Sequence, residues 1–463
     1  MKKISVILLI INICWKLFSI PVNSDTAKNI ATIWLSHKMN TTKTVFEIKT
    51  ISSHDTVFMY VFNFSKGGFV ITAADTKVIP IIAYSDIGYF DVNNMAKATS
   101  DWMQSYLETF RYIINSNHAT PNANAAWKTV NSSTAMVKSE TQPTSVPSLF
   151  ETQQTSKWSY WYPYSMYFPG EEGDDACVPI AISQICKYWR FPKQGISSNS
   201  YSVENRCNNI DTFGYFSVNF ANQLYDYSQM PFMLTYGEDS GWKAVPGITL
   251  LNQQAISHLM YDCGVAVGSY WWCQGTQGPS YNWAAYMDWY LNYNGNFNYW
   301  DTAMIDHNHS VFKDSLRNDL INSNPSLFSL VGHAVVCDGY QDNNYFHFAW
   351  GDGNDSPDGY YYLFPEDTDG IHQPKPGSAL LDATLKITPN CTRPNTQLIT
   401  VNQNTTSVKC YSAKTTITAS CTIDGNGSSG AAIMFEAGTE IILNRGFTVQ
   451  QGASFIGLID ICK

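Results

Sequence analysis

The feature that most constrains this chain is a helical run, Cys177–Trp189, that follows an acidic turn at Gly173–Asp175. One face of the run is apolar at the four-residue spacing of a helix: Ala181, Ile185 and Trp189. Pro179 suits the first helical turn, where a missing N–H costs nothing. Cys177 is therefore predicted at the helix N-terminus, where unpaired N–H groups and the helix dipole stabilise a thiolate nucleophile. The alternative is a buried cysteine that only packs.

Three β-rich runs lie well downstream and are separated by turns rich in Asp, Asn and Gly. They cover Gly332–Tyr340, Tyr345–Trp350 and Gly359–Leu363. His333 opens the first run, where an imidazole can project into a cleft. A cysteine followed much later by a histidine on a strand is the order of a catalytic Cys-His pair. A lone histidine at a strand start is more often structural.

These runs together resemble motifs of the streptopain family of papain-like cysteine peptidases. The family's cysteine helix is similar to Cys177–Trp189, its histidine strand to Gly332–Tyr340, and the strand after it to Phe346–Gly353. The family's mid-domain helix and turn are similar to Leu259–Val267. Four motifs in the same order are far more specific than any one alone. The resemblance spans roughly residues 25 to 385.

The resemblance implies an α+β fold, with a papain-like two-lobed cysteine peptidase domain at residues 148–385. It implies that Cys177 and His333 form a thiolate–imidazolium pair, which cleaves peptide bonds through a thioacyl-enzyme. No cofactor and no metal ion is expected. Acyl transfer to an amine instead of water stays open. The rival interpretation is a catalytically silent relative that binds peptides or surfaces.

Three positions depart from the family pattern. Tyr160 stands where the family has a glutamine that donates to the oxyanion, and a phenolic O–H is a competent donor there. Its alternative role is that of an aromatic core residue. Ala349 falls on the family's asparagine, which orients the imidazole, and alanine cannot hold a ring nitrogen. Ala176 replaces the glycine before the nucleophile and tightens the turn.

Other groups are therefore expected to support the imidazole. Trp350 is retained and can shield the ion pair from water. Asp352, Asn343 or a backbone carbonyl can substitute for the missing asparagine. Because an orienting partner fixes the tautomer and the geometry, its loss is expected to reduce the rate without abolishing it.

The first part of the chain has the pattern of a signal peptide followed by a prosegment. Residues 1–24 carry a positive end, a short apolar core and a small-residue exit, so they are predicted to be removed. The alternative is an anchor that is not cleaved. Residues 25–115 contain a helical pattern at Thr26–Lys38, a pair of strands and an amphipathic helix, which fit a small α+β domain. Resemblance to the streptopain prosegment implies that this domain covers the cleft and inhibits the zymogen.

Two further segments flank the peptidase domain. Residues 116–147 are rich in Asn, Ala, Ser and Thr and have little periodicity, which predicts a linker open to proteolysis. Residues 386–463 repeat a glycine turn before an apolar strand, which predicts a short β-rich tail of stacked coils. This tail is similar to solenoid-like tails on secreted bacterial proteins, and is a candidate for attachment to a cell surface.

The composition and net charge of the chain limit the classes of partner that it is expected to bind. The 463-residue chain has a net charge of −10 and only 14% charged residues, so no basic surface for nucleic acid is predicted. After the signal peptide, no stretch is long and apolar enough to cross a bilayer, so no transmembrane segment is expected in the mature chain. The expected partners are protein or peptide substrates and the chain's own prosegment as inhibitor. The expected location is secreted or at the cell surface.

Two weaker alternatives concern metals and disulfides. His307 and His309 would point to one face of an extended segment, but no third ligand is near them in sequence. Cysteines in the last part can form two disulfides in an oxidising compartment: Cys391, Cys410, Cys421 and Cys462. Cys263 and Cys273 are another candidate pair.

Overall fold

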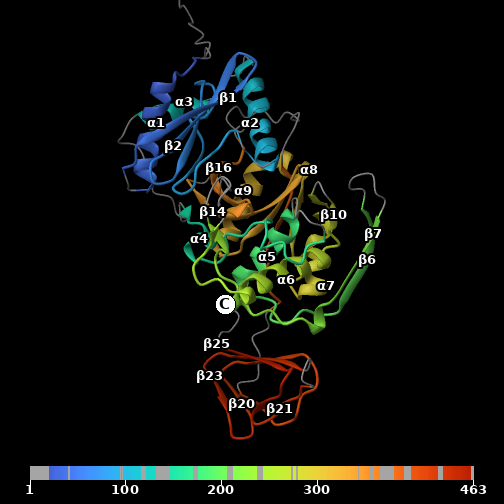
Figure 1. Cartoon of the computed structure of the whole chain (residues 1–463). Helices are drawn as coiled ribbons and strands as arrows, with labels where there is room; N and C mark the ends of the chain where they lie inside the picture. Colours follow the sequence, from blue (N-terminus) through green and yellow to red (C-terminus); the bar gives the residue numbers. More distant parts are fainter. Residues whose placement is uncertain are drawn as a thin grey trace, which may run out of the picture.

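The computed structural model describes residues 20–39, 42–93, 95, 97–115, 121–131, 145–169, 176–205, 212–236, 243–272, 275–277, 280–342, 344–353, 358–364, 380–390, 398–425 and 431–459. Three parts follow one another (Figure 1): an N-terminal domain in blue, a central domain from green to orange, and a red tail. The predicted signal peptide falls mainly on residues 1–19, outside the described residues.

The N-terminal domain is an antiparallel sheet with helices packed against it. Its elements are α1 (Ser24–Met39), β1 (Val45–Ser53), β2 (Thr56–Phe64), β3 (Phe69–Ala73), β4 (Ile81–Ser85), α2 (Lys97–Asn115) and α3 (Pro121–Asn131). The helix expected at Thr26–Lys38 is present as α1, and the expected strand pair as β2 and β3. The predicted apolar face of α2 is buried: Trp102, Tyr106, Phe110 and Ile113.

Some features of this domain differ from the sequence expectation. β1 is an additional strand, whose residues alternate between half-buried and exposed positions and whose apolar Phe46 and Ile48 are exposed. α3 lies inside the expected linker, where Trp127 Nε1–H donates to Val78 O at 2.7 Å and anchors the helix on the domain. Val22 N–H donates to Ala74 O, so the folded domain begins before the expected boundary at Ser24.

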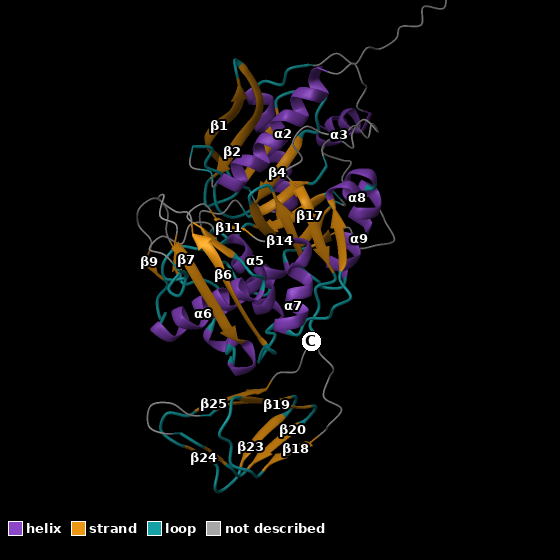
Figure 2. Ribbon diagram, turned by 90° about the vertical axis from the view of Figure 1, so that its right-hand side faces the viewer, coloured by secondary structure: helices purple, strands orange, loops and turns teal. Residues whose placement is uncertain are grey.

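The central domain has two lobes, as the resemblance implies (Figure 2). Its helical lobe contains α5 (Cys177–Trp189), α6 (Leu250–Ala266), α7 (Trp283–Leu291) and the hairpin of β6 (Ser198–Asn205) and β7 (Thr212–Asn219). Shorter elements of this lobe are β8 (Thr235–Tyr236), β9 (Lys243–Ala244), β10 (Tyr270–Trp272), β11 (Gly275–Gln277) and 3-10 turns at Phe220–Asn222, Tyr227–Gln229 and Ser280–Asn282.

The helices α5 and α6 pack closely. A Cβ on Gly264 of α6 would lie 2.4 Å from Trp271 Cζ2 and 3.0 Å from Pro179 Cγ. Only glycine therefore leaves room for the Trp271 ring against α6, at a point where α6 also contacts the first turn of α5. Farther along the two helices, Cys263 Sγ lies 4.0 Å from Cys186 Sγ, and both are free thiols. The partner suggested for Cys263 by sequence, Cys273, lies outside the described residues.

The second lobe of the central domain is built on a sheet. Its elements are α4 (Leu149–Thr152), β12 (Asn298–Asp301), α8 (Thr302–His307), α9 (His309–Ile321), β13 (Ser326–Leu330), β14 (His333–Gln341), β15 (Tyr345–Ala349), β16 (Gly359–Tyr362) and β17 (Leu380–Leu385). The three predicted β-rich runs are the antiparallel strands β14, β15 and β16. β14 is buried on both faces, with Ala334 and Val336 in the helical-lobe core and Val335 and Cys337 in the opposite core.

One sheet runs through both the N-terminal domain and the sheet lobe. Among the described residues its order is β1-β2-β3-β4-β16-β15-β14-β13-β17-β12, and β5 (Ser145–Val146) pairs with β14. The domains meet where β4 pairs with β16, with Tyr84 opposite Tyr360. They also share one hydrophobic core, in which Trp34 and Trp102 of the first domain pack with residues of the second.

The tail forms three parallel ladders. They are β18 (Leu398–Val401) with β20 (Thr416–Ala419) and β23 (Glu440–Leu443), β19 (Lys409–Ala413) with β22 (Ala432–Ala437) and β25 (Ser454–Ile459), and β21 (Thr422–Ile423) with β24 (Thr448–Val449). Stacked coils of this kind are what the repeated glycine turn predicts. Residues 386–390 stay with the central domain, because Ile387 is fully buried and its carbonyl accepts from Trp189 Nε1.

Two further sequence expectations concern membranes and thiols. Across the described ranges, no helix combines the length and the apolar character needed to span a bilayer. In the tail, Cys421 is a free thiol, while Cys391 and Cys462 lie outside the described residues. The disulfide pairing suggested for the tail therefore stays a prediction.

Candidate active site

Cys177 is the first residue of α5, as the periodicity predicts. The preceding Ala176 gives the helix no side-chain cap, so the N–H groups of the first turn are not satisfied by that residue. The helix dipole adds partial positive charge at this end. Cys177 is buried in the core of the helical lobe. The acidic turn before it lies outside the described residues. This position suits a thiolate held at a helix N-terminus.

His333 is the first residue of β14 and is buried. Its Nε2 lies 2.9 Å from the carbonyl oxygen of Trp350, and the two rings lie at 25° with centroids 6.0 Å apart. Because a carbonyl oxygen only accepts, Nε2 must carry the proton. The neutral ring then has Nδ1 as its basic nitrogen. The arrangement fixes the tautomer that a general base needs.

A tight turn after Trp350, whose carbonyl accepts from His333, packs against the first turn of α5. Gly351, which follows Trp350, has φ +80°, and a Cβ there would lie 3.0 Å from Ile180 Cγ2 in the first turn of α5. Glycine is therefore required both by the backbone conformation and by the close approach. Two residues further, Gly353 N–H donates to Trp158 O at 3.0 Å. The loop thus connects β15, α5 and the segment before α5.

The remaining predicted site residues lie in this loop or in the core of the helical lobe. Tyr160 is 9% exposed, shares the helical-lobe core with Cys177, and has its ring 4.9 Å from that of Trp161. Trp350 is buried, and its ring stacks on that of His333. Asp352 is buried in the same loop. Among the suggested substitutes for the missing asparagine, a backbone carbonyl occupies His333 Nε2, and Asn343 lies outside the described residues.

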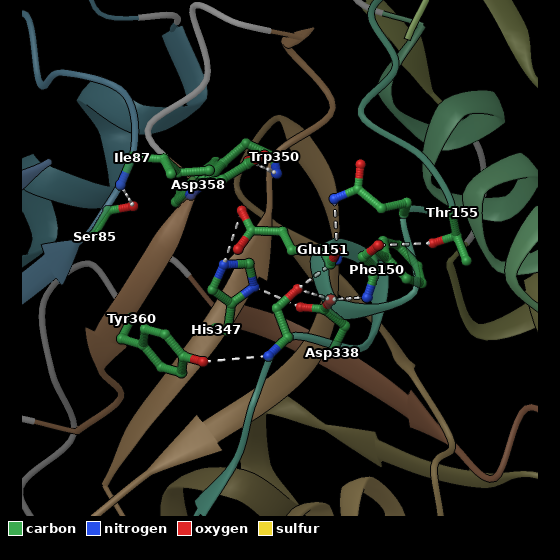
Figure 3. A network of polar contacts seen from close by, with 12 residues as sticks. Ser85, Ile87, Phe150, Glu151, Thr155, Asp338, His347, Trp350, Asp358 and Tyr360 are labelled. Carbon is green, nitrogen blue, oxygen red and sulfur yellow. Dashed lines mark hydrogen bonds and ion pairs between the residues drawn. The ribbon is translucent and has the colours of Figure 1, made fainter. Parts of the chain in front are cut away.

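A buried polar network behind the candidate site has no counterpart in the sequence prediction (Figure 3). His347 Nδ1 lies 2.6 Å from Asp338 Oδ1. The other carboxylate oxygen, Asp338 Oδ2, accepts from Ser148 Oγ at 2.6 Å and from Phe150 N–H at 2.9 Å. The network therefore ties the segment around α4 to strands β14 and β15. Its sequence signal was the presence of ionisable residues inside otherwise apolar strand motifs, Gly332–Tyr340 and Phe346–Gly353.

The network extends to the backbone of Trp350. Trp350 N–H donates to Asp358 Oδ1 at 2.8 Å, and Asp358 precedes β16 directly. Glu151 Oε1 approaches His347 Nε2 at 3.8 Å. Three carboxylates thus surround one histidine in a buried space, which favours its protonated form.

These contacts change the acid–base behaviour of His347. Burial alone lowers the pKa of His347, but the charge and hydrogen bond of Asp338, with the charges of Glu151 and Asp358, raise it to about 9. Burial also raises the pKa of the Glu151 carboxyl, and the charge of His347 opposes that effect. His347 is therefore a cation at neutral pH and balances part of the buried negative charge.

The pair His307 and His309 does not form a shared site. His307 is exposed and its Nδ1 lies 2.6 Å from Ala303 O, whereas His309 is buried and stacks on Phe364 at 4.0 Å. Within the part of the chain that the structure describes, no cluster of three or more His, Cys, Asp or Glu side chains is arranged to hold a metal ion.

Comparison with known proteins gives two family matches and several relatives. Residues 158–361 match the Peptidase C10 family, and residues 19–110 match the Spi protease inhibitor. Streptopain from Streptococcus pyogenes is 28% identical over 327 residues, which cover 66% of this chain and 73% of streptopain. The thiol protease/hemagglutinin PrtT from Porphyromonas gingivalis is 24% identical over 331 residues, which cover 69% of this chain and 35% of PrtT.

A solved structure supports the fold. A fragment of prointerpain A from Prevotella intermedia has a TM-score of 0.52 and 21% identity, and the match covers 73% of this chain and 97% of the fragment. The described fold is therefore that of a papain-like peptidase domain with its N-terminal companion domain.

We predict that His347 makes the stability of the fold depend on pH. Its folded pKa of about 9 lies above an unfolded value near 6.5, so its stabilising contribution is complete below about pH 6.5 and is lost as pH rises through about 9. One proton gives a slope of up to about 1.4 kcal/mol per pH unit in that window. Urea unfolding of the full chain in a Cys177→Ala background, between about pH 6 and about pH 10, measures it. His347→Gln should lose stability less steeply than its parent, and parallel curves would contradict the assignment.

Proposed function

Because this chain belongs to the peptidase C10 (streptopain) family of cysteine peptidases, we propose that Cys177 is its nucleophile and His333 its general base. The observation that carries the assignment is the hydrogen bond from His333 Nε2–H to Trp350 O. It leaves Nδ1 as the basic nitrogen of a ring on β14, the strand that packs against α5. Cys177 begins that helix.

The proposed reaction is endoproteolysis of protein substrates through a thioacyl-enzyme. The Cys177 thiolate attacks the peptide carbonyl while His333 holds the proton as an imidazolium. The Cys177 backbone N–H and the Tyr160 hydroxyl stabilise the oxyanion, which is where donors have their largest effect. His333 then protonates the leaving amine, and a water molecule, activated by the same ring, releases the acid. Trp350 and Asp352 complete the surroundings of the ring as supporting residues.

The chain is a zymogen, since its N-terminal domain matches a protease inhibitor family. We propose that residues 25–115 act as the inhibitory prosegment and that α2 carries the inhibition. The Trp102 ring of α2 lies 6.1 Å from the Trp350 ring at 82°, directly on the residue that holds His333. Asp101 Oδ2 lies 3.9 Å from the position of a Cβ on Gly332, the residue before His333. The helix thus contacts the base strand at its catalytic end.

Location and domain limits belong to the same proposal. A signal peptide within residues 1–24 would export the chain, and cleavage within residues 116–147 would separate the prosegment from the peptidase domain predicted at residues 148–385. β5 and α4 are both hydrogen-bonded to β14 and would remain with the peptidase domain, which favours cleavage before Ser145. The β-rich tail, predicted at residues 386–463 and built on the strands from β18 onward, would then be the means of attachment to a cell surface.

The decisive experiment is covalent labelling with an irreversible thiol-directed inhibitor after removal of the prosegment. We expect labelling at Cys177 at neutral pH, with loss of both label and hydrolysis in Cys177→Ala, while Cys410→Ala keeps both. His333→Ala should lower kcat/KM by about 1,000-fold or more with the fold intact. An unlabelled Cys177 in a correctly processed chain would favour a catalytically silent, peptide-binding relative. Product analysis separates hydrolysis from acyl transfer.

We predict that Tyr160 is an oxyanion donor. Tyr160→Phe should lower kcat by at least roughly tenfold with little change in KM, because the contact forms mainly in the transition state. Tyr160→Gln should recover activity. The matched control is Tyr162→Phe, since Tyr162 is 71% exposed in the same segment and should be silent. Steady-state kinetics with folding checked by circular dichroism decides; wild-type kcat in Tyr160→Phe would reduce Tyr160 to a packing role.

We predict that Trp102 maintains latency. In the full-length chain, Trp102→Ala should raise basal peptidase activity before processing by at least about fivefold, because it removes the ring that α2 places on Trp350. Tyr112→Ala on the exposed face of α2 is the control and should leave latency unchanged. Hydrolysis of a peptide substrate is followed from the first minutes after purification. Unchanged basal activity in a folded Trp102→Ala chain before processing would exclude this contact as the basis of inhibition.

A further inference from the structure

The main chain of Trp350 is held on both sides. Its carbonyl accepts from His333 Nε2–H at 2.9 Å, and its own N–H donates to Asp358 Oδ1 at 2.8 Å. Ala349, just before it, has no polar group that could reach the imidazole. The orientation of the ring therefore depends on a backbone carbonyl, and the position of that carbonyl depends on what fixes residue 350.

We propose that Asp358 is a positioning residue for the catalytic base. Its carboxylate fixes the Trp350 main chain, and the Trp350 carbonyl in turn holds His333 in the tautomer with Nδ1 basic. Asp358 and the Trp350 backbone together take over the task that an asparagine side chain performs where the family retains one. This inference rests on the proposed function of His333 and adds the group that orients it.

The position of Asp358 is itself well determined. It is 8% exposed and directly precedes β16, whose pairing with β15 sets it opposite the end of that strand. The next residue, Gly359, lies so close to the neighbouring strand β4 that a Cβ would be 2.7 Å from Tyr84 O. The backbone at Asp358 therefore has little freedom to shift. A residue that positions another residue must itself be held rigidly in this way.

The negative charge of Asp358 is balanced in part by the positive charge of His347. His347 is the cation of the buried network, and Asp358 is one of the carboxylates that raise its pKa. Figure 3 shows Asp358 and Trp350 on one side of this network, with Glu151, Asp338 and His347 beside them. Protonated His347 already balances negative charge in the network. We therefore expect Asp358 to act on His333 through its hydrogen bond to Trp350 N–H, and not through its charge alone.

Two variants of nearly the same shape separate these roles. Asp358→Asn removes the charge and keeps an oxygen acceptor, whereas Asp358→Leu removes both. We expect Asp358→Leu to lower kcat by about tenfold to 100-fold with KM nearly unchanged, and Asp358→Asn to stay within about threefold of wild type. Asp319→Ala is the control, because Asp319 is also buried and also accepts a backbone N–H, from Lys386 on β17's side of the sheet.

A second measurement follows the hydrogen bond itself and does not need activity. In the full-length chain with ¹⁵N-labelled histidine, the His333 Nε2–H proton, assigned with His333→Gln, should be protected from exchange in wild type, Asp358→Asn and Asp319→Ala. It should exchange with solvent in Asp358→Leu, or in Asp358→Ala if the leucine variant does not fold. Wild-type protection in a folded Asp358→Leu or Asp358→Ala, or loss of protection in Asp358→Asn, would overturn the proposal.

The two measurements also keep this proposal distinct from the function on which it rests. If Cys177 proves unreactive in the processed wild-type chain, the proposed function fails, yet the Nε2–H signal still reports whether Asp358 holds His333 through Trp350. If Cys177 is reactive and Asp358→Leu has wild-type kcat, the function stands and the positioning role falls.

Discussion

The antiparallel pairing of β14 with β15 is the constraint on which the rest of the site depends. His333 opens β14, and the pairing of Val336 with Ala349 brings the end of β15 back beside it, so that the Trp350 carbonyl reaches the imidazole. A register irregularity between Cys337 and Gly339 falls on Asp338, the residue that binds both His347 and the segment around α4. One hairpin therefore carries the candidate base, its acceptor and the buried network behind them.

The prosegment is joined to the sheet of this hairpin by antiparallel strand pairing, the same interaction that holds β14 and β15 together. β4 continues the sheet through β16, and Tyr84 Oη–H donates to Gln341 Oε1 at 2.5 Å. The hydrophobic core is shared, since Trp102 packs on both Phe348 and Trp350. Under the proposed mechanism, a helix that packs on Trp350 inhibits through the residue that orients the base, without occupying the substrate cleft.

Sequence was sufficient where one element carries its own signal. α5 follows from four-residue apolar spacing, and β14 to β16 from short apolar runs between turns. Sequence was insufficient to predict the parts of the site that depend on contacts between strands. The pairing of Asp358 with the Trp350 backbone and of His347 with Asp338 joins positions on three strands, which no single run displays. α3 was missed for another reason: its few buried side chains, Trp127 and Val130 among them, lie inside a segment of polar composition.

Removal of the prosegment leaves a different molecule from the one described. β16 lies inside the sheet only because β4 covers it, and without β4 its N–H and C=O groups would form an open edge. The aromatic side chains that face the shared core, Trp350 and Tyr361 among them, would meet water at the same time. The mature enzyme must then cover this surface with another segment or expose β16 as an edge strand, which can pair with other chains.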